Sequence, residues 1–329
     1  MKPFHWRFLH LAASVAAAFS GIFFSGQGAS SQTARTIKVI VAVPAAGPGD
    51  IMTQIFAEPM SQAFSRAHRP TIVFEPRMAA DGTIGTEYVS QAAPDGNTLL
   101  MTTNSFVINP YLRAVRYDPL TSFEPVCHLL SSPEVVVVNS ASHYRTLADL
   151  LNAARTKPGE LTMASFGPAG SSHIAVEMLK LAANVNMHYV PFPSQISAVN
   201  ALLGEHVTST ITSYKGAAEQ LKAGTLRALA TASRTRIESL PDVPTIAESG
   251  YQDYETEVRL WLFAPARTPK EMVSELADWF TAAMQEPEVK SKLVAQQLYP
   301  VGMCGAEFAA FVRKRYIDIG QVIREANIK

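Results

Sequence analysis

The chain alternates between short β-branched runs and stretches whose apolar residues recur at helical spacing. The run Ile37–Val43 is apolar and β-branched, which predicts a buried strand. It breaks at Pro44–Gly49, a segment rich in Gly and Pro, and Asp50 then stands as the expected cap of a helix. The apolar positions between Ile51 and Phe64 have the period of that helix. A strand, a loop and a capped helix in succession predict the start of an α/β unit.

The same succession continues through the middle of the chain. Four consecutive valines, Val135–Val138, predict a central strand buried on both faces. Further strands are expected at residues 71–74, 98–101, 161–165, 189–192 and 207–212, and further helices at 84–92, 147–156, 172–183 and 197–203. This alternation predicts parallel sheets flanked by helices. The last third is mainly helical: a capping box at Thr268–Glu271 begins a helix that reaches about Gln285, and two more follow from Pro287 and at 306–326.

Composition narrows the class of protein. The 329 residues are 47% hydrophobic and 17% charged, against about 25% charged in an average globular protein, which excludes an intrinsically disordered chain. The 28 Lys and Arg balance 28 Asp and Glu, so the chain has no basic excess for a nucleic-acid partner. Two cysteines cannot build a disulfide scaffold or a multi-cysteine zinc site, and whether Cys127 and Cys304 pair stays open. The length predicts two domains at roughly 150 residues each.

Residues 1–31 have the features of a secretory signal peptide. Lys2 and Arg7 give it a positive start, residues 11–24 carry no charge, and small and polar residues follow. The apolar run, residues 11–24, is shorter than the roughly 20 residues of a membrane-spanning helix, so cleavage between residues 28 and 34 is preferred over a membrane anchor, although the uncharged stretch continues to Ala34. We therefore expect an exported protein. Because the segment holds two basic and no acidic residues, removing it leaves a net charge of about −2.

Two strand-to-helix loops, Pro44–Asp50 and Ala164–His173, carry the strongest candidate chemistry. In open α/β sheets, ligands lie at the carboxyl ends of strands, where such loops converge. A helix N-terminus presents free N–H groups and a partial positive charge, so two facing loops would hold a carboxylate without Lys or Arg. The alternative is that the glycines and prolines only turn the chain, with Asp50 and Ser171 as ordinary caps.

Catalytic and metal sites have weaker support. The chain has no G-x-S-x-G elbow, S-x-x-K, P-loop or H-E-x-x-H motif, and its histidines lack metal-ligand spacing. Ser171, Ser172 and His173 adjoin at a helix start, where sequence neighbours do not form a nucleophile–base pair by default. We expect no catalytic residue, metal or cofactor, and a structural or hydrogen-bonding role for His173. Trp261 and Phe263, on a predicted strand, are expected in the core.

The second loop also carries a resemblance to a known family. ASFGPAGSSHIAVEML (Ala164–Leu179) fits the pattern A-S-x-G-x-G-[TS]-S-x-H of the Bug/TctC family, which are periplasmic solute-binding proteins of tripartite tricarboxylate transporters. Other segments similar to that family are, in order, AAPDGNTLL (92–100), INPYL (108–112), YDPLTSFEPV (117–126), HYVPF (188–192), LKAGTLRALA (221–230), LPDVPTIAESG (240–250) and APARTPKEMV (264–273). The resemblance runs from about Ile37 to the C-terminus.

This resemblance implies a two-domain α/β fold, the type II periplasmic binding protein or Venus flytrap, with a ligand cleft between the domains. Domain 1 would hold residues 36–130 and 245–329, and domain 2 residues 131–244. In the family a ligand carboxylate lies between the two loops, held by backbone amides, small hydroxyls and bridging waters. The corresponding ligand-binding positions here are Ala45, Ala46, Gly47, Gly49, Asp50, Ser165, Gly167, Ala169, Gly170, Ser171, Ser172 and His173, with Thr212 and Ser213 in a third loop.

The first loop departs from the family pattern P-F-P-A-G-G-[GS]-[TS]-D. Pro48 removes one N–H donor, and Gly49 replaces a residue with a hydroxyl. We hypothesise that fewer donors weaken carboxylate capture at this loop and that Arg259 compensates by facing the cleft.

The implied function is capture of one small organic acid and its delivery to a membrane permease, through hinge closure and without chemistry. One alternative is a periplasmic sensor that presents the bound acid to a membrane sensor kinase. A less favoured alternative is a secreted serine hydrolase that uses Ser171 or Ser172. The sequence does not identify the acid, because water and backbone contacts decide it.

Overall fold

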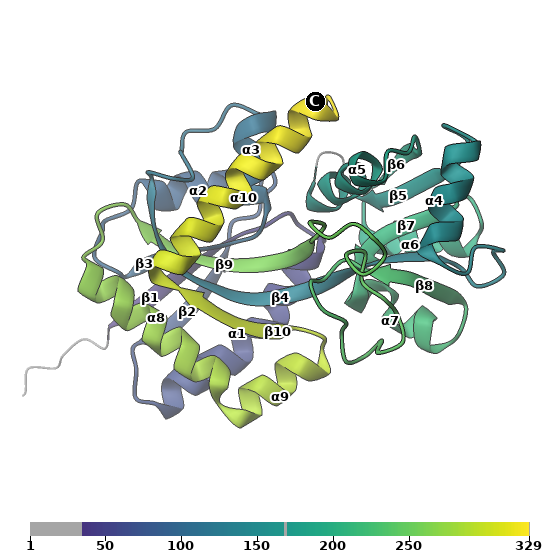
Figure 1. Cartoon of the computed structure of the whole chain (residues 1–329). Coiled ribbons are helices and arrows are strands. Elements are labelled where there is room, and N and C mark those ends of the chain that lie inside the picture. The colour runs from purple at the N-terminus through teal and green to yellow at the C-terminus, as the bar shows by residue number, and fades with distance from the viewer. Residues whose placement is uncertain (1–34, 168–169, 329) are drawn as a thin grey trace, which may run out of the picture. The chain divides into compact units, whose positions relative to one another are not determined.

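The computed structural model describes residues 35–167 and 170–328 (Figure 1). The described residues form one compact unit. The predicted signal peptide, residues 1–31, lies outside the described residues. In the described ranges, no helix is both long and apolar enough to span a bilayer.

The strands of the described ranges form one hydrogen-bonded network, ordered β2-β1-β3-β9-β4-β7-β5-β6, with β8 and β10 also paired to β4. On one side of β4 (Phe123–Asn139) lie β1 (Thr36–Ala42), β2 (Thr71–Pro76), β3 (Thr98–Thr102), β9 (Glu257–Pro265) and β10 (Tyr299–Cys304). On the other side lie β5 (Thr162–Phe166), β6 (His188–Phe192), β7 (Ser209–Ser213) and β8 (Leu226–Thr231). We call the first group of strands the β1–β3 part of the network and the second group the β5–β7 part. Strand β4 belongs to both parts.

Helices cover both faces of each part (Figure 1). On one face of the β1–β3 part, an apolar cluster packs α1 (Pro48–Arg66), α8 (Lys270–Gln285) and α9 (Pro287–Ala295). On its other face lie α2 (Thr83–Ser90), α3 (Ser105–Leu112) and α10 (Gly305–Glu325). The β5–β7 part is covered by α4 (Leu147–Thr156) and α5 (Ser171–Ala183) on one face, and by α6 (Gln195–Leu203) and α7 (Tyr214–Lys222) on the other.

Strand β4 extends far beyond the four valines that predicted it. Residues 123–133 pair antiparallel with β9, and residues 134–139 pair antiparallel with β7 and β8. Every residue from Val126 to Val138 is buried, as expected for a strand with covered faces and paired edges. The predicted domain boundaries, at residues 130 and 245, stay a prediction.

Several predictions about the elements need correction. The sheet is mixed: β1 pairs parallel with β2 and β3, and β5 with β6 and β7, but β4, β8, β9 and β10 pair antiparallel. The capping box at Thr268–Glu271 is absent, because the Thr268 hydroxyl donates to the carbonyl of Pro265 and Pro269 is the N-cap. The core position of Trp261 and Phe263 is confirmed, since they are 1% and 0% exposed.

A disulfide bond joins β4 to β10 within the β1–β3 part. Cys127 and Cys304 are directly opposite partners in the β4–β10 pair, and their sulfurs are bonded. The bond joins positions 177 residues apart, so it ties the first residues of α10 to the centre of the sheet. The sequence left open whether the two cysteines pair, and the structure shows that they do.

Removing this bond is expected to destabilise the protein by about 2–5 kcal/mol, because a long loop is freed in the unfolded chain. The double variant Cys127→Ala/Cys304→Ala should unfold at a lower urea concentration than the oxidised protein. Dithiothreitol should lower the midpoint of the natural protein and leave that of the double variant unchanged. Equal midpoints for the oxidised protein and the double variant would contradict the expected contribution.

Candidate functional site

Both candidate loops end in helices whose N-caps are glycines. Gly47 caps α1 and Gly170 caps α5, and neither helix has a side-chain hydrogen bond at its cap. The first N–H groups of a helix have no intrahelical partner and carry its positive end. The loops follow β1 and β5, so both helix ends lie at carboxyl ends of parallel strands.

The first loop corrects the role predicted for Asp50. The helix begins at Pro48, one turn earlier than expected, so Asp50 lies inside its first turn and is not the cap. Its carboxylate accepts hydrogen bonds from the backbone N–H of Ala46, at 3.0 Å, and from Gln54, at 2.8 Å. The Ala46 amide is therefore used within the loop, and Pro48 has none to offer. Ala45 and Ala46 are exposed, whereas Gly47, Gly49 and Asp50 are buried.

The second loop is held by a tyrosine that the sequence did not single out. The Tyr189 hydroxyl accepts from Ser165, at 3.2 Å, and donates to the carbonyl of Gly167, at 3.1 Å. Its ring stacks on His173 with centroids 3.8 Å apart, and burial raises the pKa of Tyr189 to about 12. Gly167 has φ +73°, a conformation that glycine adopts without strain. Ala169 lies outside the described residues.

The two loops touch each other. A Cβ added to Gly47 would lie 2.8 Å from the ring of Phe166, the last residue of β5. The glycine therefore lets the start of α1 approach the end of β5 closely. A Cβ on Gly49 would lie 2.4 Å from the Thr103 side chain, so both glycines are required by close packing.

The third loop lies beside them, at the end of β7. Thr212 and Ser213 are 2% and 3% exposed. Ser213 is the N-cap of α7, and its hydroxyl accepts from the amide of Gln195 at 2.7 Å. Within the described residues, Thr212 Oγ1 and Gln195 Oε1 are buried without a hydrogen-bond partner.

Glu134 is a buried acid that sequence reasoning missed. It is 1% exposed and accepts a hydrogen bond from the Ser172 hydroxyl at 2.8 Å. It is the first residue after the crossing point of β4, which is the place where the partner of β4 changes from β9 to β7. Burial raises the pKa of Glu134, and the bond from Ser172 opposes that rise. Ser172 is thus bonded to an acid and not to a histidine, while His173 Nε2 lies 3.7 Å from Glu177. This geometry gives no support to the hydrolase alternative.

Arg259 does not have the free charge that its proposed role requires. It is 1% exposed, and its guanidinium lies 2.5 Å from Glu255 and 3.7 Å from Glu257. The spacing Glu255-x-Glu257-x-Arg259 is a signal of this pairing, because alternate positions of a strand share one face. The hypothesis that Arg259 compensates for the missing first-loop donors stays a prediction, and it requires the paired guanidinium to face the cleft as well.

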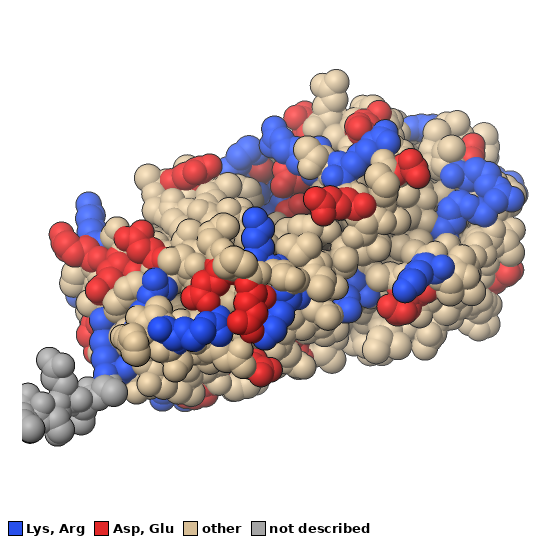
Figure 2. Space-filling model, turned by 90° about the horizontal axis from the view of Figure 1, so that it is seen from below, with Lys and Arg blue, Asp and Glu red and all other residues tan. Residues whose placement is uncertain are grey.

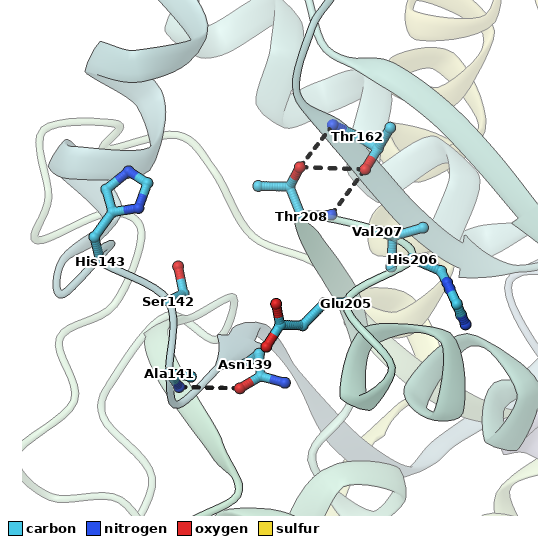
Figure 3. Close-up of a pocket in the computed structure, with 9 residues that line it drawn as sticks. All are labelled: Asn139, Ala141, Ser142, His143, Thr162, Glu205, His206, Val207 and Thr208. Atoms are coloured by element: carbon cyan, nitrogen blue, oxygen red, sulfur yellow. Dashed lines mark hydrogen bonds between the residues drawn. The ribbon is translucent and has the colours of Figure 1, made fainter.

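A separate pocket of about 410 Å³ lies away from these loops (Figure 3). Asn139, Thr162 and Thr208 line it, and Thr162 pairs with Thr208 through three hydrogen bonds. Thr162 begins β5, so this pocket is at the opposite end of the strand from Phe166. His143 and Glu205 also line it, but the described residues hold no group of three or more potential metal ligands.

Charges of both signs are interspersed over most of the face seen in Figure 2, and uncharged residues cover the larger share. Most ion pairs between described residues are local or exposed, as for Lys314 with Asp318 and Arg236 with Glu248. The predicted site residues from the three loops thus lie at one edge of the network, built mainly from backbone, hydroxyl and amide groups.

Comparison with known proteins identifies the sequences that this chain is similar to. Residues 56–328 match the profile of the tripartite tricarboxylate transporter family receptor, TctC. The match begins after the first loop, the region where the chain departs from the family pattern. The protein BugT of Bordetella pertussis is 28% identical over 318 residues, covering 94% of this chain and 96% of BugT.

Solved structures agree with the sequence match. A structure described as a periplasmic transporter is 31% identical, with a TM-score of 0.74, covering 89% of this chain and 98% of that one. A protein of R. palustris solved with adipate is 26% identical, also with a TM-score of 0.74 and the same coverage. The two-domain α/β fold of periplasmic binding proteins expected from the sequence is thereby confirmed.

Replacing Glu134 with glutamine is expected to change the pH dependence of stability. In the unfolded chain a glutamate has a pKa of about 4.3, and in the folded protein the pKa of Glu134 is higher. The contribution of this shift to the free energy of unfolding is therefore fully present below pH ~4.3 and is lost as the pH rises through the pKa of the folded protein. Relative to the natural protein, Glu134→Gln should therefore gain free energy of unfolding between pH 4 and pH 8, at about 1.4 kcal/mol for each pKa unit of the rise.

Urea denaturation at several pH values measures this difference. Glu219→Gln serves as the matched control, because Glu219 is exposed on α7. A difference between Glu134→Gln and the natural protein that stays constant from pH 4 to pH 8 would contradict the raised pKa.

Proposed function

Because the chain belongs to the TctC/Bug family of tripartite tricarboxylate transporter receptors, which are periplasmic solute-binding proteins, we propose that it captures a small carboxylate between its first and second loops. The observation that carries this proposal is the contact between the two loops. Each loop leads into a helix that has no side-chain hydrogen bond at its N-cap. Gly47 of the first loop lies against Phe166 of the second. A carboxylate between them would meet the positive ends of α1 and α5 together.

The energetics suit an anion held without a dedicated cation. A hydrogen bond to a charged group contributes about 1.5–3 kcal/mol, so four or five such bonds reach micromolar affinity after the entropic cost of association. The Thr212 hydroxyl, buried at the end of β7 without a hydrogen-bond partner among the described residues, would supply a further polar contact. The R. palustris relative solved with adipate supports a carboxylic acid as the ligand class.

Binding would be coupled to motion of the two loops. Since Phe166 packs against Gly47 in this structure, a ligand enters only when the loops separate, and contacts with both loops then favour the closed arrangement. We further propose that the protein is exported by a cleaved signal peptide and delivers its ligand to a permease of the tripartite tricarboxylate type.

A thermal-unfolding screen against organic acids tests the proposed function. At 100 times its dissociation constant, a ligand stabilises the protein by about 2.7 kcal/mol, which raises the melting temperature by a few degrees. At least one small carboxylate in a panel of mono- and dicarboxylates should give this shift, and its primary amide should not. A panel in which no acid raises the melting temperature would overturn the proposal.

Gly47→Val tests whether the loops form the site. Gly47 has φ −91° and ψ 173°, an extended backbone that any residue adopts, so the substitution acts through the contact with Phe166 and not through backbone strain. We expect at least tenfold weaker binding of the acid found in the screen. Ile196→Val, at a residue that is 71% exposed on α6, is the control and should bind normally.

A further inference from the structure

Glu134 reaches the second loop through one side-chain contact. Its carboxyl oxygen Oε1 accepts a hydrogen bond from the Ser172 hydroxyl at 2.8 Å, and the two residues are 1% and 2% exposed. Ser172 is the second residue of α5, and the first intrahelical bond there runs from the Ile174 N–H to the carbonyl of Gly170. The contact therefore holds the start of α5, where the second loop ends, against the crossing point of β4.

The backbone of Glu134 holds the third loop as well. Glu134 is opposite Ser213 in the β4–β7 pair, and Ser213 is the N-cap of α7. The Glu134 carbonyl accepts from the N–H of Ala232, just after β8, at 2.8 Å. One residue thus connects two of the three predicted ligand loops, through its side chain and through its main chain. Because burying an ionised carboxylate costs free energy, the protonation state of Glu134 affects the loops that it holds.

The charged groups that act on Glu134 from β9 are Arg259 and Glu257. The guanidinium of Arg259 favours the ionised form of Glu134, and the carboxylate of Glu257 favours the neutral form. Arg259 also lies 2.5 Å from Glu255 and 3.7 Å from Glu257, so its charge is shared between those two glutamates. Burial has the largest effect, and it raises the pKa of Glu134.

The titratable groups on α5 and beside it are engaged with other partners. Tyr254 is buried and donates its hydroxyl to a carbonyl of α5, and burial raises its pKa, so it stays neutral. On α5, His173 stacks on Tyr189 and its Nε2 lies 3.7 Å from Glu177, which also accepts from Lys180 at 2.8 Å. Ionising Glu134 would therefore place a negative charge at the start of α5 that Arg259 compensates only in part.

That charge would compete with the ligand for the same end of the helix. The start of α5 carries a partial positive charge, which stabilises an anion near it. An ionised Glu134 takes this stabilisation from inside the protein, and it repels a second carboxylate placed between the loops. A neutral Glu134 removes the repulsion, and its carbonyl oxygen still accepts the bond from Ser172.

We propose that Glu134 is a positioning residue that couples capture of the carboxylate to uptake of a proton, because the loops that it holds bind the anion tightly only when Glu134 is neutral. The inference rests on the proposed function, since the acid between the loops is the anion that an ionised Glu134 repels. The proton comes from solvent, and no bond of the ligand changes. By linkage, the anion binds more weakly as the pH rises and Glu134 ionises.

Calorimetry with ionised carboxylates between pH 6 and pH 8 tests this coupling. The probes are acetate, butyrate, malate and adipate, together with the acid that gives the largest shift in the thermal screen. For the probe that binds the natural protein most tightly, the dissociation constant should rise at least about fivefold from pH 6 to pH 8, since one proton changes it by at most tenfold per pH unit. Titrations in buffers of different ionisation enthalpy should show net proton uptake on binding.

Two substitutions separate the proton from the hydrogen bond. Glu134→Gln keeps an acceptor for Ser172 and removes the titrating group, so its dissociation constant should be nearly the same at pH 6 and pH 8, without proton uptake. Glu134→Ala removes the acceptor as well, and should bind more weakly than Glu134→Gln at both pH values. Glu219→Gln, at an exposed residue of α7, is the matched control and should keep the pH dependence of the natural protein.

The outcomes separate this inference from the proposed function. A natural protein that binds no acid of the wider screen overturns both. Binding that is as tight at pH 8 as at pH 6, or a pH dependence that persists in Glu134→Gln, overturns the role of Glu134 and leaves carboxylate capture intact. If Glu134→Gln does not fold, an infrared difference spectrum of the natural protein at pH 8 replaces it. Binding should then add the carbonyl band of a protonated carboxylic acid, and a spectrum without that band contradicts the proposal.

Discussion

The continuity of β4 is the constraint on which the rest of the structure depends. A single strand pairs with β9 through its first part and with β7 and β8 through its second, so the two parts of the network share one backbone. The backbone N–H and C=O groups of a strand buried on both faces must form their hydrogen bonds with neighbouring strands. These hydrogen bonds fix the positions of both β7 and β9 relative to β4. Those neighbours carry Ser213 and Arg259, and Glu134, paired with Ser213, directly follows the last residue paired with β9. The polar residues of the site are thus organised around one crossing point.

Charge near this crossing point is controlled by burial and pairing. Burial raises the pKa of Glu134, and it lowers the pKa of His128 to about 3, so the His128 ring is neutral at neutral pH. Arg259 is neutralised by two glutamates. Fixed backbone dipoles at Gly47 and Gly170 then make up much of the local field. An arrangement of this kind explains how a lightly charged protein can receive an anion.

Local patterns predicted most elements, but not those set by partners far along the chain. The helix over residues 147–156 was predicted with its observed bounds, because Thr146 and Pro158 mark its ends clearly. Strand β4 was predicted only at its valines, since Ser131–Pro133 resemble a loop until β9 pairs with them. Pro48 was a usable signal for the start of α1, because proline favours the first helical position, and Asp50 was given the wrong role for that reason.

The same distinction applies to the site. Both glycine-rich loops were located from sequence, since turn chemistry is local. Tyr189 and Glu134 were missed because each matters only through an element that the fold brings beside it: the second loop for Tyr189 and the start of α5 for Glu134. No residue type or spacing in the sequence records those contacts.

The Cys127–Cys304 bond sets a condition on how the chain matures. One sulfur belongs to the first half of the sequence and the other to its last tenth, and the two residues are 177 positions apart. Oxidation to the native pairing must wait until almost the whole polypeptide has been made and has reached an oxidising compartment. The intervening β5–β7 part contains neither cysteine and is free to acquire its contacts earlier. Formation of the bond therefore requires that β10, and with it the start of α10, has already come beside β4.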